Sequence, residues 1–246
     1  MARAQRRKAL DQFFVVGRLV LLACLVLLFM RLPVLSNVLD LLGTFFHELG
    51  HGLFAFLTGG QVLQLALSWD GSGFLRRAGG FTLITAWMGY AGTMAAGLAL
   101  YVSMTRQQLA GRTVLWVCAG LIAVVILFWA KDWTTRAIGL MLAGFLTGLG
   151  FLLRLSVGNL GQSHRQLFPG KLVVRFIGLT LIIGSMVRAW DLIGFSEHND
   201  SRTLAEHYFL FPFVWIASWE LFGAACIWGC YQMDVAEERR RVAANA

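Results

Sequence analysis

The chain has 246 residues, of which 58% are hydrophobic and only 14% are charged. Ordinary globular proteins are about 45–50% apolar and about 25% charged, so a soluble fold of this length could not bury so much apolar surface. The net charge of +8 does not indicate nucleic-acid binding, because the basic residues stand at both ends of the chain and in ones and twos between apolar runs. That arrangement is typical of loops that flank membrane spans and contact lipid headgroups. The composition therefore predicts an integral membrane protein with membrane lipids, and no nucleic acid, as partners.

Seven apolar segments are long enough to span a hydrocarbon core of about 30 Å, which takes about 20 helical residues. The first follows a basic start, as a secretory signal does, but it is too long for a signal core and offers no cleavage site at Arg31-Leu32-Pro33. Lys and Arg divide evenly between the two sides, so they do not choose an orientation. We expect one domain over 1–246, an all-α multi-pass fold with about six to seven transmembrane helices. The segments are 13–30, 34–57, 81–104, 113–130, 135–153, 173–190 and 208–230.

Two connections between these segments are informative. After the second segment, Val62 to Ser68 has the composition of a strand, and Asp70-Gly71 favours a tight turn, so we expect a short membrane-associated β-hairpin. The later connection, Asp191 to His207, holds four acids and two histidines and is expected to be a loop.

The motif His47-Glu48-Leu49-Gly50-His51 carries the strongest chemical signal. Two histidines four residues apart lie on one face of a helix and can bind one metal ion. Glu48 can reach a metal-bound water as general base, and zinc lowers the pKa of such a water to about 7. On a soluble surface helix the pattern often has no function, but an acid in a membrane span is costly unless it is paired or functional. We therefore predict a zinc site with His47 and His51 as ligands and Glu48 as the catalytic residue.

A catalytic zinc needs a third protein ligand and an open fourth position. Asp40 shares the helix face of the first histidine but lies about 10 Å along the axis, too far to join both histidines on one ion. Asp191 follows the sixth apolar segment, so a helix end can deliver it, whereas Asp200 can arrive from the loop. We favour Asp191 as third ligand, with Asp200 as the alternative, and Arg188 can pair with Asp191. The other candidates are Glu197, His198, Glu206 and His207.

Four stretches of the chain carry a family resemblance. The most specific is F-H-E-L-G-H-G-L-F-A-F-L-T-G-G at 46–60, and L-S-W-D-G-S-G-F-L-R-R at 67–77 follows it. The others are Gly89-Tyr90-Ala91-Gly92 and the N-D-S…L-A-E segment at 199–206. Together they resemble the site-2 protease family of intramembrane zinc metallopeptidases, in particular a compact branch that is little more than the membrane core.

The resemblance implies a zinc endopeptidase that cuts membrane-spanning or signal-like substrates within or near the bilayer. It assigns His47 and His51 as ligands and Glu48 as base, and makes the hairpin an edge that pairs with an unwound substrate strand. Better-known members bring their third ligand on an L-D-G segment, which is missing here, and Trp190-Asp191-Leu192 is its nearest counterpart. The short loops favour a bacterial inner membrane.

Two other function classes compete with the protease. A catalytically inactive zinc-binding or regulatory membrane protein of the same fold is favoured by the missing L-D-G segment. A zinc transporter would carry histidines and acids on several spans, but only one span has such a pair. The transporter is therefore the weakest of the three.

Overall fold

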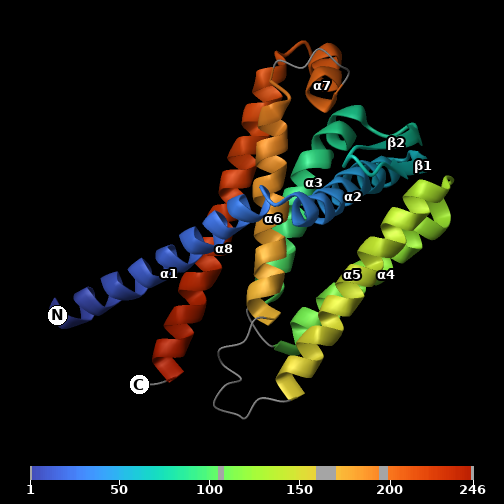
Figure 1. Ribbon diagram of the computed structural model, residues 1–246. Coiled ribbons are helices and arrows are strands. Elements are labelled where there is room, and N and C mark those ends of the chain that lie inside the picture. Colours follow the sequence, from blue (N-terminus) through green and yellow to red (C-terminus); the bar gives the residue numbers. More distant parts are fainter. Residues whose placement is uncertain (1, 105–107, 159–169, 194–198, 245–246) are drawn as a thin grey trace.

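The computed structural model describes residues 2–104, 108–158, 170–193 and 199–244. Within these ranges the chain forms eight helices and one two-stranded hairpin (Figure 1), so the predicted helical fold with a short hairpin is confirmed. Each of the seven predicted apolar segments coincides with a helix over most of its length, although the last one includes the non-helical residues 209–211. The elements are α1 (Ala2–Phe29), α2 (Pro33–Leu57), β1 (Gln61–Leu67), β2 (Gly73–Ala78), α3 (Thr82–Ser103), α4 (Gln108–Trp129), α5 (Trp133–Gly158), α6 (Gly170–Asp191), α7 (Asp200–Tyr208) and α8 (Pro212–Ala244).

Five of the described helices, α3, α4, α5, α6 and α8, are long and apolar enough to cross a membrane. A shorter apolar segment, Val15–Phe29, lies in α1. The chain is therefore a multi-pass membrane protein. The helix α2 is not among these five, because its mean hydropathy is too low. Asp40 and the polar residues of the predicted metal site lower it.

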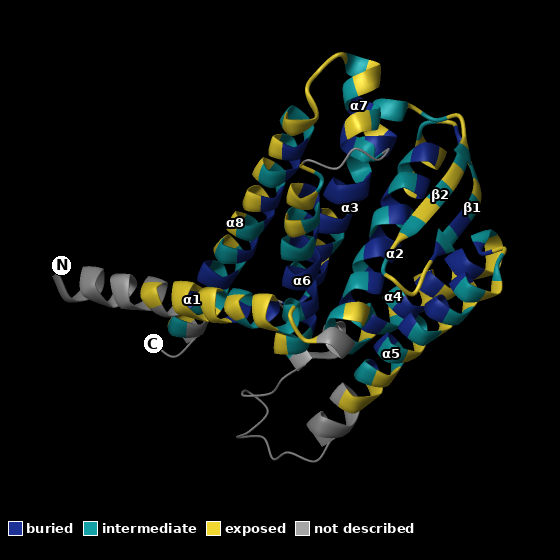
Figure 2. Ribbon diagram, turned by 45° about the horizontal axis from the view of Figure 1, so that its top comes forward, coloured by how far each residue is buried: buried dark blue, intermediate teal, exposed yellow. Residues whose placement is uncertain are grey.

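The centre of the molecule is formed by α3 and α6. Half of the apolar window of each is buried, against 28–33% in α4, α5 and α8. Figure 2 shows the buried positions of these helices turned inward and many exposed ones on the outer faces. One apolar cluster joins α2, β1, α4 and α5 to α6, and a second joins α1, α3, α7 and α8 to α6. Because α2 packs against α3, the face of α2 that carries the histidines is held inside the bundle.

The hairpin follows α2 directly and has the predicted turn. β1 and β2 are antiparallel, with Leu65 opposite Leu75. Gly71 has φ +86°, a conformation that only glycine adopts without strain. The Asp70 carboxylate accepts hydrogen bonds from the backbone N–H and the hydroxyl of Ser72 at 2.9 and 2.7 Å. These bonds are those of an Asx turn, so the hairpin prediction from Asp70-Gly71 is confirmed.

The two outer edges of the hairpin differ. On β1, Leu65 forms a bridge with Ala130, and the Leu67 N–H donates to the hydroxyl of Thr135 at 2.9 Å. The connection between α4 and α5 therefore covers this edge. On β2, no described strand pairs with the outer edge. The free edge of the hairpin is thus the one that belongs to β2.

Two segments differ from the sequence prediction. The connection from Asp191 to His207 was expected to be a loop, but it contains α7, whose N-cap Asn199 accepts a hydrogen bond from the Arg202 N–H at 3.1 Å. The last helix extends past the predicted end at 230, because its C-terminal part carries acids that pair with basic residues of α1 and α6.

Candidate metal centre

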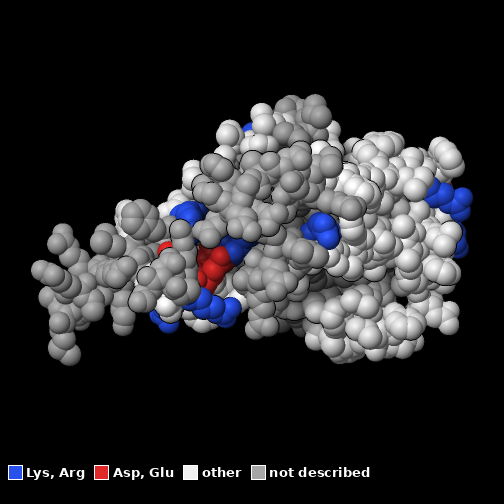
Figure 3. Space-filling model, turned by 90° about the horizontal axis from the view of Figure 1, so that it is seen from below, with Lys and Arg blue, Asp and Glu red and all other residues white. Residues whose placement is uncertain are grey.

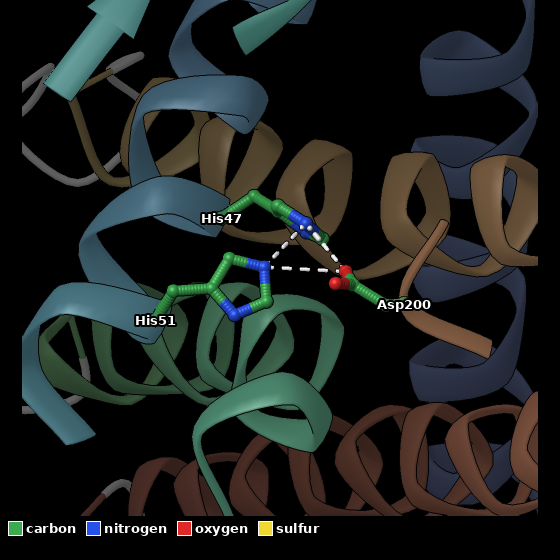
Figure 4. A group of neighbouring side chains, drawn as sticks. All are labelled: His47, His51 and Asp200. Carbon is green, nitrogen blue, oxygen red and sulfur yellow. Dashed lines mark hydrogen bonds and ion pairs between the residues drawn. The ribbon is translucent and has the colours of Figure 1, made fainter. Parts of the chain in front are cut away.

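Three side chains from two helices converge on one point (Figure 4). The Nε2 atoms of His47 and His51, one turn apart on α2, are 3.0 Å from each other. The Oδ2 atom of Asp200, at the start of α7, lies 3.0 Å from the first Nε2 and 3.2 Å from the second. Among the described residues this is the one group of three or more potential metal ligands whose donor atoms all lie within 4.8 Å of one another.

The geometry and chemistry of this group fit a zinc ion. Zinc–nitrogen and zinc–oxygen bonds of about 2.0–2.1 Å in a tetrahedral site separate the donors by about 3.3–3.4 Å. The observed separations of 3.0–3.2 Å are slightly shorter, so a small outward movement of the side chains accommodates the ion. Two imidazoles and one carboxylate are also a ligand set that leaves the fourth position of a catalytic zinc open.

Neighbouring groups fix the orientation of the two imidazoles. His51 Nδ1 lies 2.7 Å from the carbonyl oxygen of Thr85. A carbonyl only accepts, so Nδ1 carries the proton and Nε2 presents its lone pair to the metal position. The ring of His47 packs edge-on against Tyr90 at 4.5 Å, and Tyr90 in turn packs against Trp219 at 4.6 Å. The backbone of α3 and its aromatic residue therefore hold both ligands.

Glycines allow α2 and α3 to approach closely at the site. A Cβ at Gly50 would lie 2.2 Å from the carbonyl oxygen of Met88. A Cβ at Gly89 would lie 2.5–2.6 Å from the rings of His51 and His47. A larger residue at either position would displace the helices or the imidazoles. The need for this close approach explains why Gly50 and Gly89 lie at the site.

Asp200 is placed by the packing of α7. Ser201 and Leu204 are buried against the bundle and anchor the helix. Loss of contact with water disfavours the charged carboxylate, but the neighbouring His51 and His47 outweigh this effect and hold the pKa of Asp200 well below its ordinary range. The first turn of a helix also favours an acid. This carboxylate is therefore ionised and available as a ligand.

Glu48 lies beside the group and lines the cavities next to it. The residue is 5% exposed, and no ion pair joins it to a Lys or Arg among the described residues. Two cavities meet at Glu48, which lines both together with His47, Gly73 and Tyr90. We call them the turn cavity, about 480 Å³, which also contacts the hairpin turn, and the strand cavity, about 440 Å³, which also contacts β2 and α7.

Asp191, the third ligand favoured from the sequence, and Asp40, which the sequence excluded as too distant, do not join the group. Asp191 lies at the end of α6 and lines the turn cavity, but is not among the converging donors. Asp40 pairs with Arg188 at 2.8 Å, so the predicted pairing of Arg188 with Asp191 is wrong. The guanidinium lies over α2, within reach of Asp40 and Thr44, and both of these accept its hydrogen bonds.

The remaining candidates fall outside the site. Glu206 and His207 are exposed on α7, where Glu206 pairs with Arg202 at 3.6 Å. Glu197 and His198 lie outside the described residues. Sequence reasoning missed the carbonyl of Thr85 and the packing of Tyr90 on His47. A backbone acceptor leaves no signal in a sequence, although the Gly-Tyr-Ala-Gly stretch did mark this part of α3.

A His-His-Asp group beside the glutamate of an H-E-x-x-H helix, within a helical membrane protein, is typical of a membrane-embedded metallopeptidase. The chain matches the Peptidase M50B-like family over residues 19–230. It therefore belongs to this site-2 protease-like family of metallopeptidases, as its motifs predict. No match was found among curated proteins or among solved structures.

Proposed function

We propose that the protein is an intramembrane zinc metalloendopeptidase that hydrolyses peptide bonds of membrane-spanning or membrane-anchored substrates. The observation that carries this proposal is the convergence of His47, His51 and Asp200 beside a buried, unpaired Glu48 at the junction of two cavities. In this proposal Asp200, rather than Asp191, is the third ligand.

The roles of the side chains follow from their positions. His47, His51 and Asp200 would hold the zinc, which when bound supplies Lewis acidity to water and to the peptide carbonyl. Glu48 takes a proton from the attacking water and later gives it to the leaving nitrogen, as a general base and acid does. No Lys or Arg among the described residues forms an ion pair with Glu48, so its carboxylate is free to accept that proton.

The free edge of β2 supports the binding of an extended substrate. A helical backbone hides its carbonyls in its own hydrogen bonds, so it has to unwind before hydrolysis. An unwound segment can pair with the outer edge of β2 as an added strand. Gly73, the first residue of β2, lines both cavities, so this edge leads past Glu48 and the histidines.

The inactive zinc-binding alternative depended on the missing L-D-G segment. Asp200 supplies a carboxylate from a different element, at 3.0 and 3.2 Å from the two histidines. The absence of L-D-G therefore no longer argues against a complete ligand set, and the protease is the better-supported proposal.

The test is to purify the full chain in detergent and to measure bound zinc by mass spectrometry and the cleavage of single-span substrates. We expect about one zinc per chain in the wild type and in Glu48→Gln, and little in His47→Ala. His207→Ala, at an exposed histidine of α7, is the matched control and should keep the zinc. Cleavage should be present in the wild type and absent in Glu48→Gln.

Two results would overturn the proposal. A wild-type protein without zinc would leave the histidines without a metal role. Zinc bound at full occupancy with no cleavage of a broad panel of single-span substrates would support the inactive regulatory protein.

A further inference from the structure

We infer that the turn cavity is an acidic subsite that selects substrates with a basic residue on the C-terminal side of the cleaved bond. This inference rests on the proposed peptidase function and adds a substrate class to it. It depends on the charges around the cavity, on the free edge of β2 and on the direction of that strand.

The turn cavity has more acids than its one cation can neutralise. Asp40, Glu48, Asp70 and Asp191 line it, and Arg188 is the basic residue in its wall. Arg188 is already bound to Asp40 by an ion pair of 2.8 Å. The hydrogen bonds from Ser72 hold the pKa of Asp70 below its ordinary value, so Asp70 is ionised at neutral pH. The charge of Glu48 would be offset by the zinc beside it, so Asp70 and Asp191 are the acids that leave an excess of negative charge to attract a cation.

The arrangement of these acids fits a side chain on a polypeptide better than a second metal ion. They come from α2, the hairpin turn and the end of α6, and among the described residues they do not form a group of donors within 4.8 Å. Glu48, 5% exposed and unpaired among the described residues, faces the same cavity. The cavity therefore opens directly from the reacting position, where a substrate side chain would enter it.

The strand cavity has a different character. Its lining includes Arg77 of β2 as well as Asp200, and Asp200 is committed to the two histidines. Excess negative charge is therefore confined to one side of Glu48. A charged residue of the substrate would be recognised differently on the two sides of the cleaved bond.

The direction of β2 decides which side of the substrate meets the acids. β2 runs from Gly73 at the turn toward Ala78, so it leads away from the turn cavity. Antiparallel pairing is the more stable mode per residue. A substrate strand antiparallel to β2 runs toward the turn, and its C-terminal part then lies beside Asp70 and Asp191.

The experiment measures kcat/KM for matched single-span substrates in detergent. They carry Lys, Gln or Glu two to four residues C-terminal to the cleaved bond, or the same Lys at the equivalent N-terminal positions. We expect the wild type to prefer C-terminal Lys over Gln by about 5- to 10-fold, because these acids are partly screened by water. We expect C-terminal Glu to be the poorest substrate.

Variants of the lining acids tie this preference to the cavity. Asp191→Asn with Asp70→Asn, which keeps an oxygen for the Ser72 hydrogen bonds, should reduce the Lys/Gln ratio to about 1–2. Glu206→Gln removes an exposed acid of α7 outside both cavities and should leave the ratio unchanged. An unchanged ratio in the double variant, or a preference for Lys on the N-terminal side, would overturn the inference.

Binding to the inactive Glu48→Gln protein separates this inference from the proposed function. Fluorescence anisotropy with the same peptides reports the charge preference without cleavage. Charge-dependent binding together with no cleavage by the wild type would contradict the peptidase proposal and leave the acidic subsite intact. Cleavage by the wild type at equal rates for Lys, Gln and Glu substrates would support the peptidase proposal and contradict the acidic subsite.

Discussion

Among the described residues, two of the polar clusters in this apolar chain solve the problem of buried charge in opposite ways. The first is the candidate metal centre of α2 and α7. The second, which we call the α6–α8 ion cluster, consists of Lys171, Arg175, Asp234 and Glu237. Seen from below, acidic side chains gather in one patch with basic ones around it (Figure 3).

The α6–α8 ion cluster balances its charges internally. Arg175 pairs with Asp234 at 3.0 Å and with Glu237 at 2.7 Å, and Lys171 also pairs with Glu237. The hydroxyl of Tyr101 donates to Asp234 at 2.8 Å. Two cations and two acids leave no net charge, and none of the four lines the turn or strand cavity. A cluster of this kind joins helices.

The metal centre has two acids, because Glu48 lies beside the His-His-Asp group that contains Asp200. The two imidazoles of the group can be neutral, and the group contains no Lys or Arg. A divalent cation would restore the balance that the other cluster supplies with Lys and Arg. Open cavities adjoin this centre. The comparison suggests a rule for buried acids in membrane proteins: an internally paired acid holds the fold together, and an unpaired acid beside a cavity performs chemistry.

The largest effect is expected from removing the third ligand of the metal centre. Asp200→Ala should lower zinc affinity by well over a hundred-fold and abolish cleavage. Loss of a residue that only hydrogen-bonds to a ligand costs about 10- to 100-fold, and loss of a ligand itself should cost more. Asp191→Ala should keep zinc at wild-type stoichiometry. Zinc content by mass spectrometry after competition with a chelator measures both. Full zinc in Asp200→Ala, with loss in Asp191→Ala, would restore Asp191 as the ligand.

The next effect concerns the ion cluster and should be on stability alone. Asp234→Ala leaves the guanidinium of Arg175 only partly compensated in a largely buried position, which costs about 3 kcal/mol. Thermal unfolding in detergent should show a clear fall, while the folded fraction keeps its zinc. Replacing the pair together, as Arg175→Met with Asp234→Leu, should recover most of the loss. Zinc loss in folded Asp234→Ala would contradict the separation of the two clusters.

A smaller change tests the close approach of α3 to the ligands. Gly89→Ala places a methyl group 2.5–2.6 Å from both imidazole rings, and overpacking of this kind costs about 1–3 kcal/mol. The rings have to move apart, so zinc should bind more weakly. Gly144→Ala in α5, where a Cβ meets nothing within 4 Å, is the matched control. Equal zinc affinity in the two variants would mean that the site adapts to the methyl group.

Sequence reasoning found the parts of the site that local spacing defines. The i, i+4 spacing of His47 and His51, the turn residues Asp70-Gly71 and the apolar segments each depend on neighbours within a few residues. The α6–α8 ion cluster was not predicted from the sequence. Its acids lie beyond the apolar run that marks the last span, and the basic residues that pair with them come from another helix.

The third ligand could not be chosen from the sequence for a related reason. Asp200 is 149 positions beyond His51, and its place depends on how α7 packs against α3 and α8. The sequence does carry a local signal for α7, since Asn199 before Asp200 is a good N-cap with an acid in the first turn. Asp191 was favoured because it ends an apolar helix, but that end faces the turn cavity.

The smallest expected effect tests whether the hairpin turn is held in place for substrate. Arg188 donates to Asp40 and to the hydroxyl of Thr44, and Thr44 in turn donates to the carbonyl of Gly71 at 2.6 Å. Arg188→Lys keeps the charge, but a single ammonium cannot reproduce the planar fork that reaches both partners. With Thr44 free to turn away, the hairpin loosens from α2.

Losing one such hydrogen bond costs about 1 kcal/mol, so KM should rise about 3- to 10-fold while kcat and zinc content change little. Steady-state cleavage of one single-span substrate, with zinc measured on the same preparation, separates these quantities. A fall in kcat at constant KM would place Arg188 at the reacting atoms instead. A loss of zinc would mean that the turn supports the metal centre as well as the substrate edge, and the two sides of Glu48 would then act as one unit.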